Sequence, residues 1–192
     1  MGCERQDFRR LADEWLRRTR DKVSFLLDQG VGPFWHFNGV ERASPPMMGP
    51  KQWAELVEPY DGAIMRLIKA RDPKARISVH CHGRVATLLD SFVAMGVDAT
   101  DPVEPPIQGD VDFVATKKRY ADKLVFFGNI EFCDLETKTP DQVETLVKAA
   151  LCDGGTDNVV LTPSAAPHEK PTAKFLANAV RYIEAGLKYG AR

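Results

Sequence analysis

The chain of 192 residues carries 26 basic and 27 acidic side chains, and its formal net charge of -1 argues against a nucleic-acid-binding protein, in which basic residues normally dominate. Its length suits one sizeable core, no apolar stretch approaches the roughly 20 residues of a membrane span, and the charged N-terminus does not resemble an export signal. The four scattered cysteines include no CxxC pair, which is typical of reduced thiols, so we expect a cytoplasmic protein.

Helical and extended patterns alternate from the N-terminus onward. Residues 5–28 carry apolar side chains at helical spacing and are followed by Gly30, which predicts a leading helix within residues 1–30. An aromatic strand is expected at residues 34–38, followed by a loop rich in proline and glycine. The apolar stripe from Trp53 to Ile68 then predicts a helix.

The alternation continues to the C-terminus. Further strands are expected at residues 77–82, 98–104, 124–131 and 158–162, and helices near residues 84–95, 110–122, 139–154 and 171–189. Thr139-Pro140-Asp141-Gln142 forms a capping box with proline at the first helical position. Asp110 is expected to cap the helix that follows it. Because no linker or internal repeat interrupts the pattern, residues 1–192 are interpreted as a single domain.

This alternation predicts an α/β fold with about five parallel strands and covering helices. Five strands would suit a doubly wound open sheet. A closed (β/α) barrel needs eight strands, so a barrel would lack its N-terminal portion here.

Polar and ionisable side chains follow the end of each expected strand. Because ligands bind at the carboxyl edge of parallel sheets, this pattern predicts an active site there. The side chains, taken strand by strand, are His36, Asn38 and Glu41; His80 and His82; Asp101 and Glu104; Asn129 and Glu131; Thr162 and Ser164.

His80 and His82 are the sharpest local feature. Alternation along a strand places both on one face, about 7 Å apart, while Cys81 points to the other face as an expected core thiol. The two imidazoles could hold a metal such as zinc, with Glu104 as a further ligand, or contact a substrate. The alternative is that one histidine is structural and the other solvated.

In combination, these motifs resemble the uroporphyrinogen decarboxylase superfamily, which includes decarboxylases of porphyrin synthesis and zinc-dependent methyltransferases that exchange methyl groups with corrinoid proteins. The resemblance runs from about residue 31 to the C-terminus and implies the C-terminal portion of a TIM (β/α)8-type barrel. It rests on Pro45-Pro46, Gly49-Pro50, Glu58-Pro59-Tyr60, Val79-His80-Cys81-His82-Gly83, Gly96-Val97-Asp98, Gly128-Asn129-Ile130 and Thr162-Pro163-Ser164.

Within the superfamily the chain is most similar to the methyltransferase branch, and this resemblance implies a metal site. His80 matches a zinc ligand of the methyltransferases, and His82 stands where they use a cysteine. Ala165 occupies the position of their further cysteine, and Pro163 that of a histidine in the decarboxylases. The N-terminal arginines and aspartate with which the decarboxylases bind their substrate have no counterpart in this chain.

Three hypotheses follow. The first is zinc-assisted methyl transfer to or from a corrinoid borne by a partner protein, the second is tetrapyrrole decarboxylation, and the third is a non-catalytic half-barrel that associates with another chain, such as a second copy. For an enzyme acting on a small molecule, the expected catalytic residues are His80, His82, Glu104, Asn129 and Glu131. The expected metal ligands are His80, His82 and Glu104, and the expected substrate-binding residues are His36, Asn38, Glu41, Thr162 and Ser164.

Overall fold

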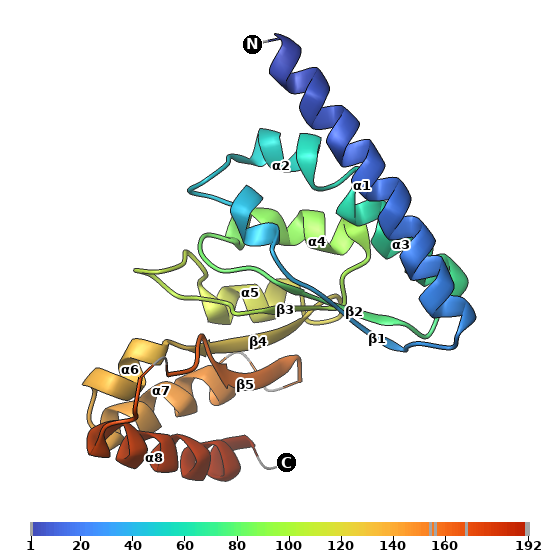
Figure 1. Cartoon of the computed structure of the whole chain (residues 1–192). Coiled ribbons are helices and arrows are strands. Elements are labelled where there is room, and N and C mark those ends of the chain that lie inside the picture. The colour runs from blue at the N-terminus through green and yellow to red at the C-terminus, as the bar shows by residue number, and fades with distance from the viewer. Residues whose placement is uncertain (1, 154, 156, 168, 191–192) are drawn as a thin grey trace.

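Five strands and their covering helices make up the fold in the computed structural model, which describes residues 2–153, 155, 157–167 and 169–190 (Figure 1). The strands are β1 (Phe34–Phe37), β2 (Arg76–His80), β3 (Ala99–Asp101), β4 (Val125–Ile130) and β5 (Val159–Pro163). The α-helices are α1 (Gly2–Asp28), α2 (Pro50–Leu56), α3 (Asp61–Arg71), α4 (Leu89–Met95), α5 (Phe113–Arg119), α6 (Phe132–Thr137), α7 (Pro140–Cys152) and α8 (Ala173–Gly190). Short 3-10 helices occupy Val40–Ala43 (η1) and Ala86–Leu88 (η2).

The strands lie side by side in chain order, β1-β2-β3-β4-β5, and every neighbouring pair is parallel. A doubly wound sheet reverses its strand order at a switch point, whereas a (β/α) barrel is wound in one direction. The sequential order therefore confirms an α/β fold of the partial TIM-barrel type.

The two faces of the sheet differ in burial. Ile77, Val79 and Phe126 are 0% exposed and pack against the covering helices. On the opposite face Phe34 is 80% exposed, and Arg76 beside it is also exposed. Helices thus cover one face among the described residues, as on the outside of a barrel, and the other face corresponds to a barrel interior.

Several helical boundaries differ from the predicted ones. The helix predicted over the Trp53–Ile68 stripe is divided into α2 and α3, because Pro59 lacks an amide hydrogen and disfavours helical backbone before it. The short helix α6 was not anticipated. The prediction that Asp110 caps the next helix was wrong: the Asp112 side chain accepts from Ala115 N, whereas Asp110 accepts from Ala86 N. The capping box at Thr139 is confirmed.

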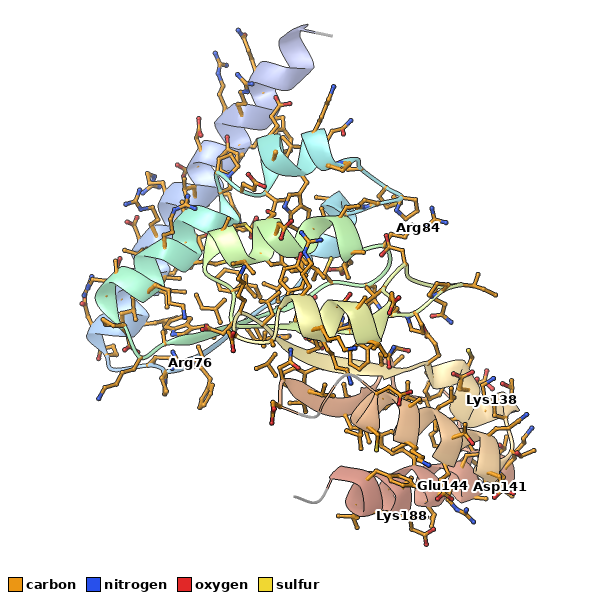
Figure 2. The ribbon with its side chains drawn as sticks, turned by 180° about the vertical axis from the view of Figure 1, so that it is seen from behind. Arg76, Arg84, Lys138, Asp141, Glu144 and Lys188 are labelled. Carbon is orange, nitrogen blue, oxygen red and sulfur yellow. The ribbon has the colours of Figure 1, made fainter. Side chains whose placement is uncertain are left out.

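An ion-pair cluster joins the last two helices, α7 and α8. Glu144 of α7 accepts hydrogen bonds from Arg181 Nη1 at 2.7 Å, from Lys188 Nζ at 2.9 Å and from the Tyr189 hydroxyl at 2.9 Å. These donors lower the pKa of Glu144 to about 2, so it stays ionised. Glu144 and Lys188 lie close together at the end of the molecule in Figure 2.

None of the described helices combines the length and apolar character needed to cross a membrane.

Candidate active site

The carboxyl edge of the sheet gathers histidines and carboxylates from three neighbouring strands. The register places His36 of β1 opposite Ser78 of β2, and His80 of β2 opposite Asp101 of β3. The imidazole rings of His80 and His82 lie 4.7 Å apart and nearly perpendicular, and those of His36 and His80 lie 6.1 Å apart. The predicted convergence of the two histidines of the His-x-His motif is therefore present in the structure.

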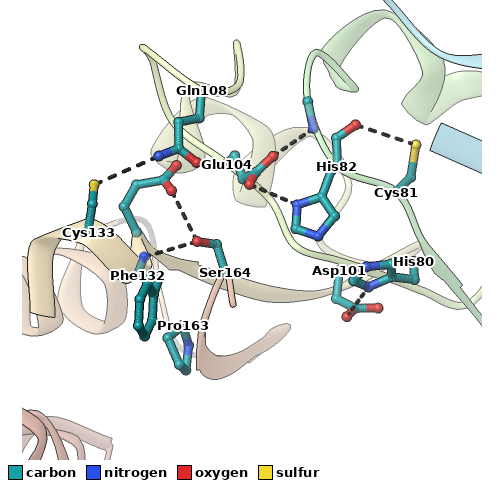
Figure 3. Close-up of polar contacts among 12 residues, drawn as sticks. His80, Cys81, His82, Asp101, Glu104, Gln108, Phe132, Cys133, Pro163 and Ser164 are labelled. Carbon is teal, nitrogen blue, oxygen red and sulfur yellow. Dashed lines mark hydrogen bonds and ion pairs between the residues drawn. The ribbon is translucent and has the colours of Figure 1, made fainter. Parts of the chain in front are cut away.

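Each imidazole has a polar partner at Nδ1. His80 donates to Asp101 Oδ2 at 2.9 Å, and His82 donates to Glu104 Oε1 at 2.9 Å (Figure 3). His36 Nδ1 lies 2.8 Å from Ser78 Oγ. A carboxylate bonded to one ring nitrogen fixes the orientation of the imidazole and leaves its other nitrogen for a ligand, a proton or a metal.

Glu104 occupies a buried position behind His82. The residue is 4% exposed, and its second oxygen, Oε2, accepts from the Gly83 amide at 2.6 Å. The loop after it folds back closely: a Cβ on Gly109 would stand 2.0 Å from the Glu104 carbonyl oxygen, so only glycine fits there. Because both carboxylate oxygens are engaged, Glu104 serves as a partner for the His82 ring and the following turn.

Glu131 extends the site toward β5. The residue is 6% exposed, its Oε2 accepts from the Ser164 hydroxyl at 3.0 Å, and its Oε1 has no hydrogen-bond partner among the described residues. Ser164 is itself fixed by the Phe132 amide. Burial is the main cause that raises the pKa of Glu131, and the nearby charge of Glu104 also raises it. The hydrogen bond from Ser164 and the charge of His82 act in the opposite direction. The net effect is a pKa for Glu131 above the usual value of a glutamate side chain.

Among the described residues, none of the remaining predicted site residues is hydrogen-bonded to this cluster through its side chain. Asn129 and Thr162 are paired in register on β4 and β5, both half-buried. Asn38 is exposed beyond β1. Glu41 lies in η1, where its Oε2 is buried without a partner among the described residues, and its charge acts on the thiol of Cys81. Cys81 is 0% exposed and burial raises its pKa to about 12, which agrees with the predicted core thiol.

The set of side chains best placed to hold a metal differs from the predicted one. Among the described residues, His36, His80 and Asp101 each offer one ligand atom, and these atoms lie within 4.8 Å of one another. Two imidazoles and a carboxylate are a donor set that zinc takes in catalytic sites, where three protein ligands leave one position open. His80 is common to this set and to the predicted one. The role of Asp101 could have been anticipated from its position, since it ends β3 as His80 ends β2.

A model of a known protein family matches most of the chain. The family model described as Uroporphyrinogen decarboxylase (URO-D) matches residues 2–177, which include every strand and every side chain of the site described above. None of the curated proteins matches the chain.

Proposed function

Because the chain belongs to the uroporphyrinogen decarboxylase family, we propose that it is an enzyme that transfers a methyl group with the help of a bound divalent metal ion. The metal that fits this role best is zinc. The observation that carries the proposal is the convergence of His36, His80 and Asp101 at the carboxyl edge of the sheet, with ligand atoms within 4.8 Å of one another. Zinc bound there would act as a Lewis acid and lower the pKa of a thiol or hydroxyl group of the methyl acceptor.

The neighbouring residues would prepare the acceptor for reaction. His82, fixed at Nδ1 by Glu104, presents its other ring nitrogen to the same edge and can take the proton that the acceptor thiol releases. The sulfur can then form its bond to the methyl carbon as the bond from that carbon to the donor breaks, and the donor keeps the electron pair. A corrinoid carried by a partner protein is the methyl donor that the family resemblance implies.

The first test is zinc binding to the full chain, measured by metal analysis and by calorimetric titration. The proposal expects one zinc per chain, lost on changing His36, His80 or Asp101 to alanine and retained in His82→Ala. Loss in His82→Ala together with retention in His36→Ala would instead support the ligand set His80, His82 and Glu104. A wild-type chain that binds no zinc would end the proposal of metal assistance.

The second test is methyl transfer itself. Methylcobalamin, as a free corrinoid donor, and a small thiol are incubated with the zinc-loaded chain, and loss of the cobalt–methyl bond is followed by absorbance. The expected result is demethylation that depends on zinc and disappears in His80→Ala. Zinc binding without demethylation by any thiol or hydroxyl acceptor offered would count against methyl transfer.

Glu131 favours a second candidate, the decarboxylation of a tetrapyrrole. Decarboxylation leaves a carbon that must take up a proton, and a buried carboxyl group with a raised pKa can supply one. Anaerobic incubation with uroporphyrinogen should then release carbon dioxide without added metal, and Glu131→Gln should abolish the release. Absence of carbon dioxide from the wild-type chain would eliminate this candidate.

A further inference from the structure

The three imidazole rings at the carboxyl edge are held by partners of two kinds. His80 and His82 each meet a carboxylate group at Nδ1, whereas Nδ1 of His36 lies 2.8 Å from the hydroxyl oxygen of Ser78. A carboxylate can only accept a hydrogen bond from the ring, but a hydroxyl group can either donate or accept one. The direction of this single hydrogen bond therefore decides which nitrogen of His36 is free for a ligand.

Strand pairing brings Ser78 beside His36. The register sets His36 of β1 opposite Ser78 of β2, and Ser78 precedes His80 by two residues on the same face of β2. β2 lies between β1 and β3 in the sheet, and Ser78 is half-buried while His36 is exposed. The hydroxyl group is thus the better fixed member of the pair, so it is placed to orient the His36 ring.

The proton of the Ser78 hydroxyl group has an acceptor other than the ring. Ser78 Oγ donates to the backbone carbonyl oxygen of Trp35 at 3.5 Å. A hydroxyl group has one proton and two lone pairs, so a hydroxyl whose proton is directed to Trp35 turns a lone pair to His36. His36 then donates from Nδ1, and a neutral imidazole that is protonated at Nδ1 keeps its lone pair on Nε2. In this form His36 presents a nitrogen that can bind a metal ion.

We propose that Ser78 is a positioning residue, which holds His36 in the Nδ1-protonated form and turns its Nε2 toward the ligand atoms of His80 and Asp101. The ligand atoms of these three residues lie within 4.8 Å of one another. A histidine that binds a metal through one ring nitrogen almost always donates through the other, and loss of that partner lowers metal affinity by about 10–100-fold. The effect of Ser78 on zinc rests on the proposed function, whereas its effect on the proton of His36 does not.

The first experiment locates that proton in the zinc-free full chain. Nitrogen NMR at a pH where the ring is neutral distinguishes the two protonated forms of His36, whose signals are identified by their loss in His36→Gln. The proton should be on Nδ1 in the wild-type chain, and in Ser78→Ala it should move to Nε2 or be shared between the two nitrogens. Ser78→Thr keeps the hydroxyl group and should restore the wild-type form. A wild-type chain with the proton on Nε2, or a Ser78→Ala variant with an unchanged ring, would overturn the proposal.

The second experiment measures zinc affinity by calorimetric titration. Ser78→Ala should bind zinc about 10–100-fold more weakly than wild type, and Ser78→Thr should recover most of the loss. Ser91→Ala is the matched control, because Ser91 Oγ accepts from Trp53 Nε1 at 2.8 Å and donates to Glu58 Oε1 at 2.8 Å. This hydroxyl group has the same two roles, but neither of these partners belongs to the site. Its loss should lower stability and leave zinc affinity unchanged.

The two experiments separate the failure of this proposal from the failure of the proposed function. Equal losses of zinc affinity in Ser78→Ala and Ser91→Ala would indicate a general loss of stability and would overturn the positioning role. A wild-type chain that binds no zinc would end the proposal of metal assistance. The NMR result on the zinc-free wild-type chain would then decide by itself whether Ser78 sets the protonated form of His36, and it does not depend on the folding of any Ser78 variant.

Discussion

His82 and Glu104 are joined across the carboxyl edge of the sheet, with Nδ1 2.9 Å from Oε1, although 22 residues separate them in the chain. The carboxylate is buried and the imidazole is part-exposed, with side-chain exposures of 5% and 41%. The pair thus combines a fixed anchor with a ring that can reach a ligand. This asymmetry indicates that Glu104 orients the His82 ring, and under the proposed function His82 would be the member of the pair that meets the substrate.

We expect Glu104→Gln to destabilise the fold without removing zinc. A glutamine has one acceptor oxygen, so either the His82 ring or the Gly83 amide loses its partner in a buried position, which costs about 1–3 kcal/mol of unfolding free energy. Denaturant unfolding measures the loss, and Glu136→Gln, at an exposed position of α6, is the control. Loss of zinc from Glu104→Gln would show that Glu104 is itself a ligand.

The second expectation concerns the proton on Glu131. Burial raises the pKa of Glu131, and the hydrogen bond from Ser164 opposes that rise. Ser164→Ala should therefore raise the pKa of Glu131 further, as measured by a carboxyl carbon NMR titration. Thr145→Ala removes a hydroxyl group from α7 and should leave the titration unchanged. A lower pKa in Ser164→Ala would contradict the arrangement described for the site.

The third expectation is a pH-dependent gain in stability from Asp61→Asn. Burial raises the pKa of Asp61, at the start of α3, to about 6, against about 3.9 for an unfolded chain. Between these values the folded chain holds a proton that the unfolded chain releases, so wild-type stability falls as pH rises from about 4 to 6.

Asparagine cannot ionise and avoids this loss. At pH 8 we expect Asp61→Asn to be more stable than wild type by about 1–2 kcal/mol, a figure reduced for the partial exposure of the side chain. At pH 4 the two should nearly coincide. Chemical denaturation at both pH values measures the difference, and a gain of equal size at pH 4 would exclude ionisation of Asp61 as the cause.

The fourth expectation concerns Lys117, which is 0% exposed. Its ammonium group donates to Ala150 O at 2.7 Å and to Gly155 O at 2.9 Å, joining α5 to the end of α7. Lys117→Met retains much of the side-chain volume but leaves two carbonyl groups without this donor, so we expect a loss of about 2–4 kcal/mol. Lys118→Met, at the exposed neighbouring position, should change stability by less than about 0.5 kcal/mol. Equal effects of the two substitutions would contradict the role assigned to Lys117.

The sequence predicted most elements of this fold because their signals are local. Five strands appear near the predicted positions, and the capping box at Thr139 begins α7 as expected. The main error, a single helix in place of α2 and α3, arose because the apolar stripe continues across Pro59 while the backbone cannot. Strand β3 is shorter than predicted and ends before Pro102, which cannot donate a hydrogen bond to a neighbouring strand.

Alternation along β2 and the resemblance to a known family placed His80 and His82 at a common edge from the sequence alone. The pairing of His80 with Asp101 and of His82 with Glu104, and the approach of His36 to His80, were decided by the tertiary structure. The reason is physical: side-chain alternation is a property of each strand, whereas the register between strands and the fold of the loop after β3 depend on packing between distant segments. One residue of slippage in that register would turn the same side chains toward the opposite face.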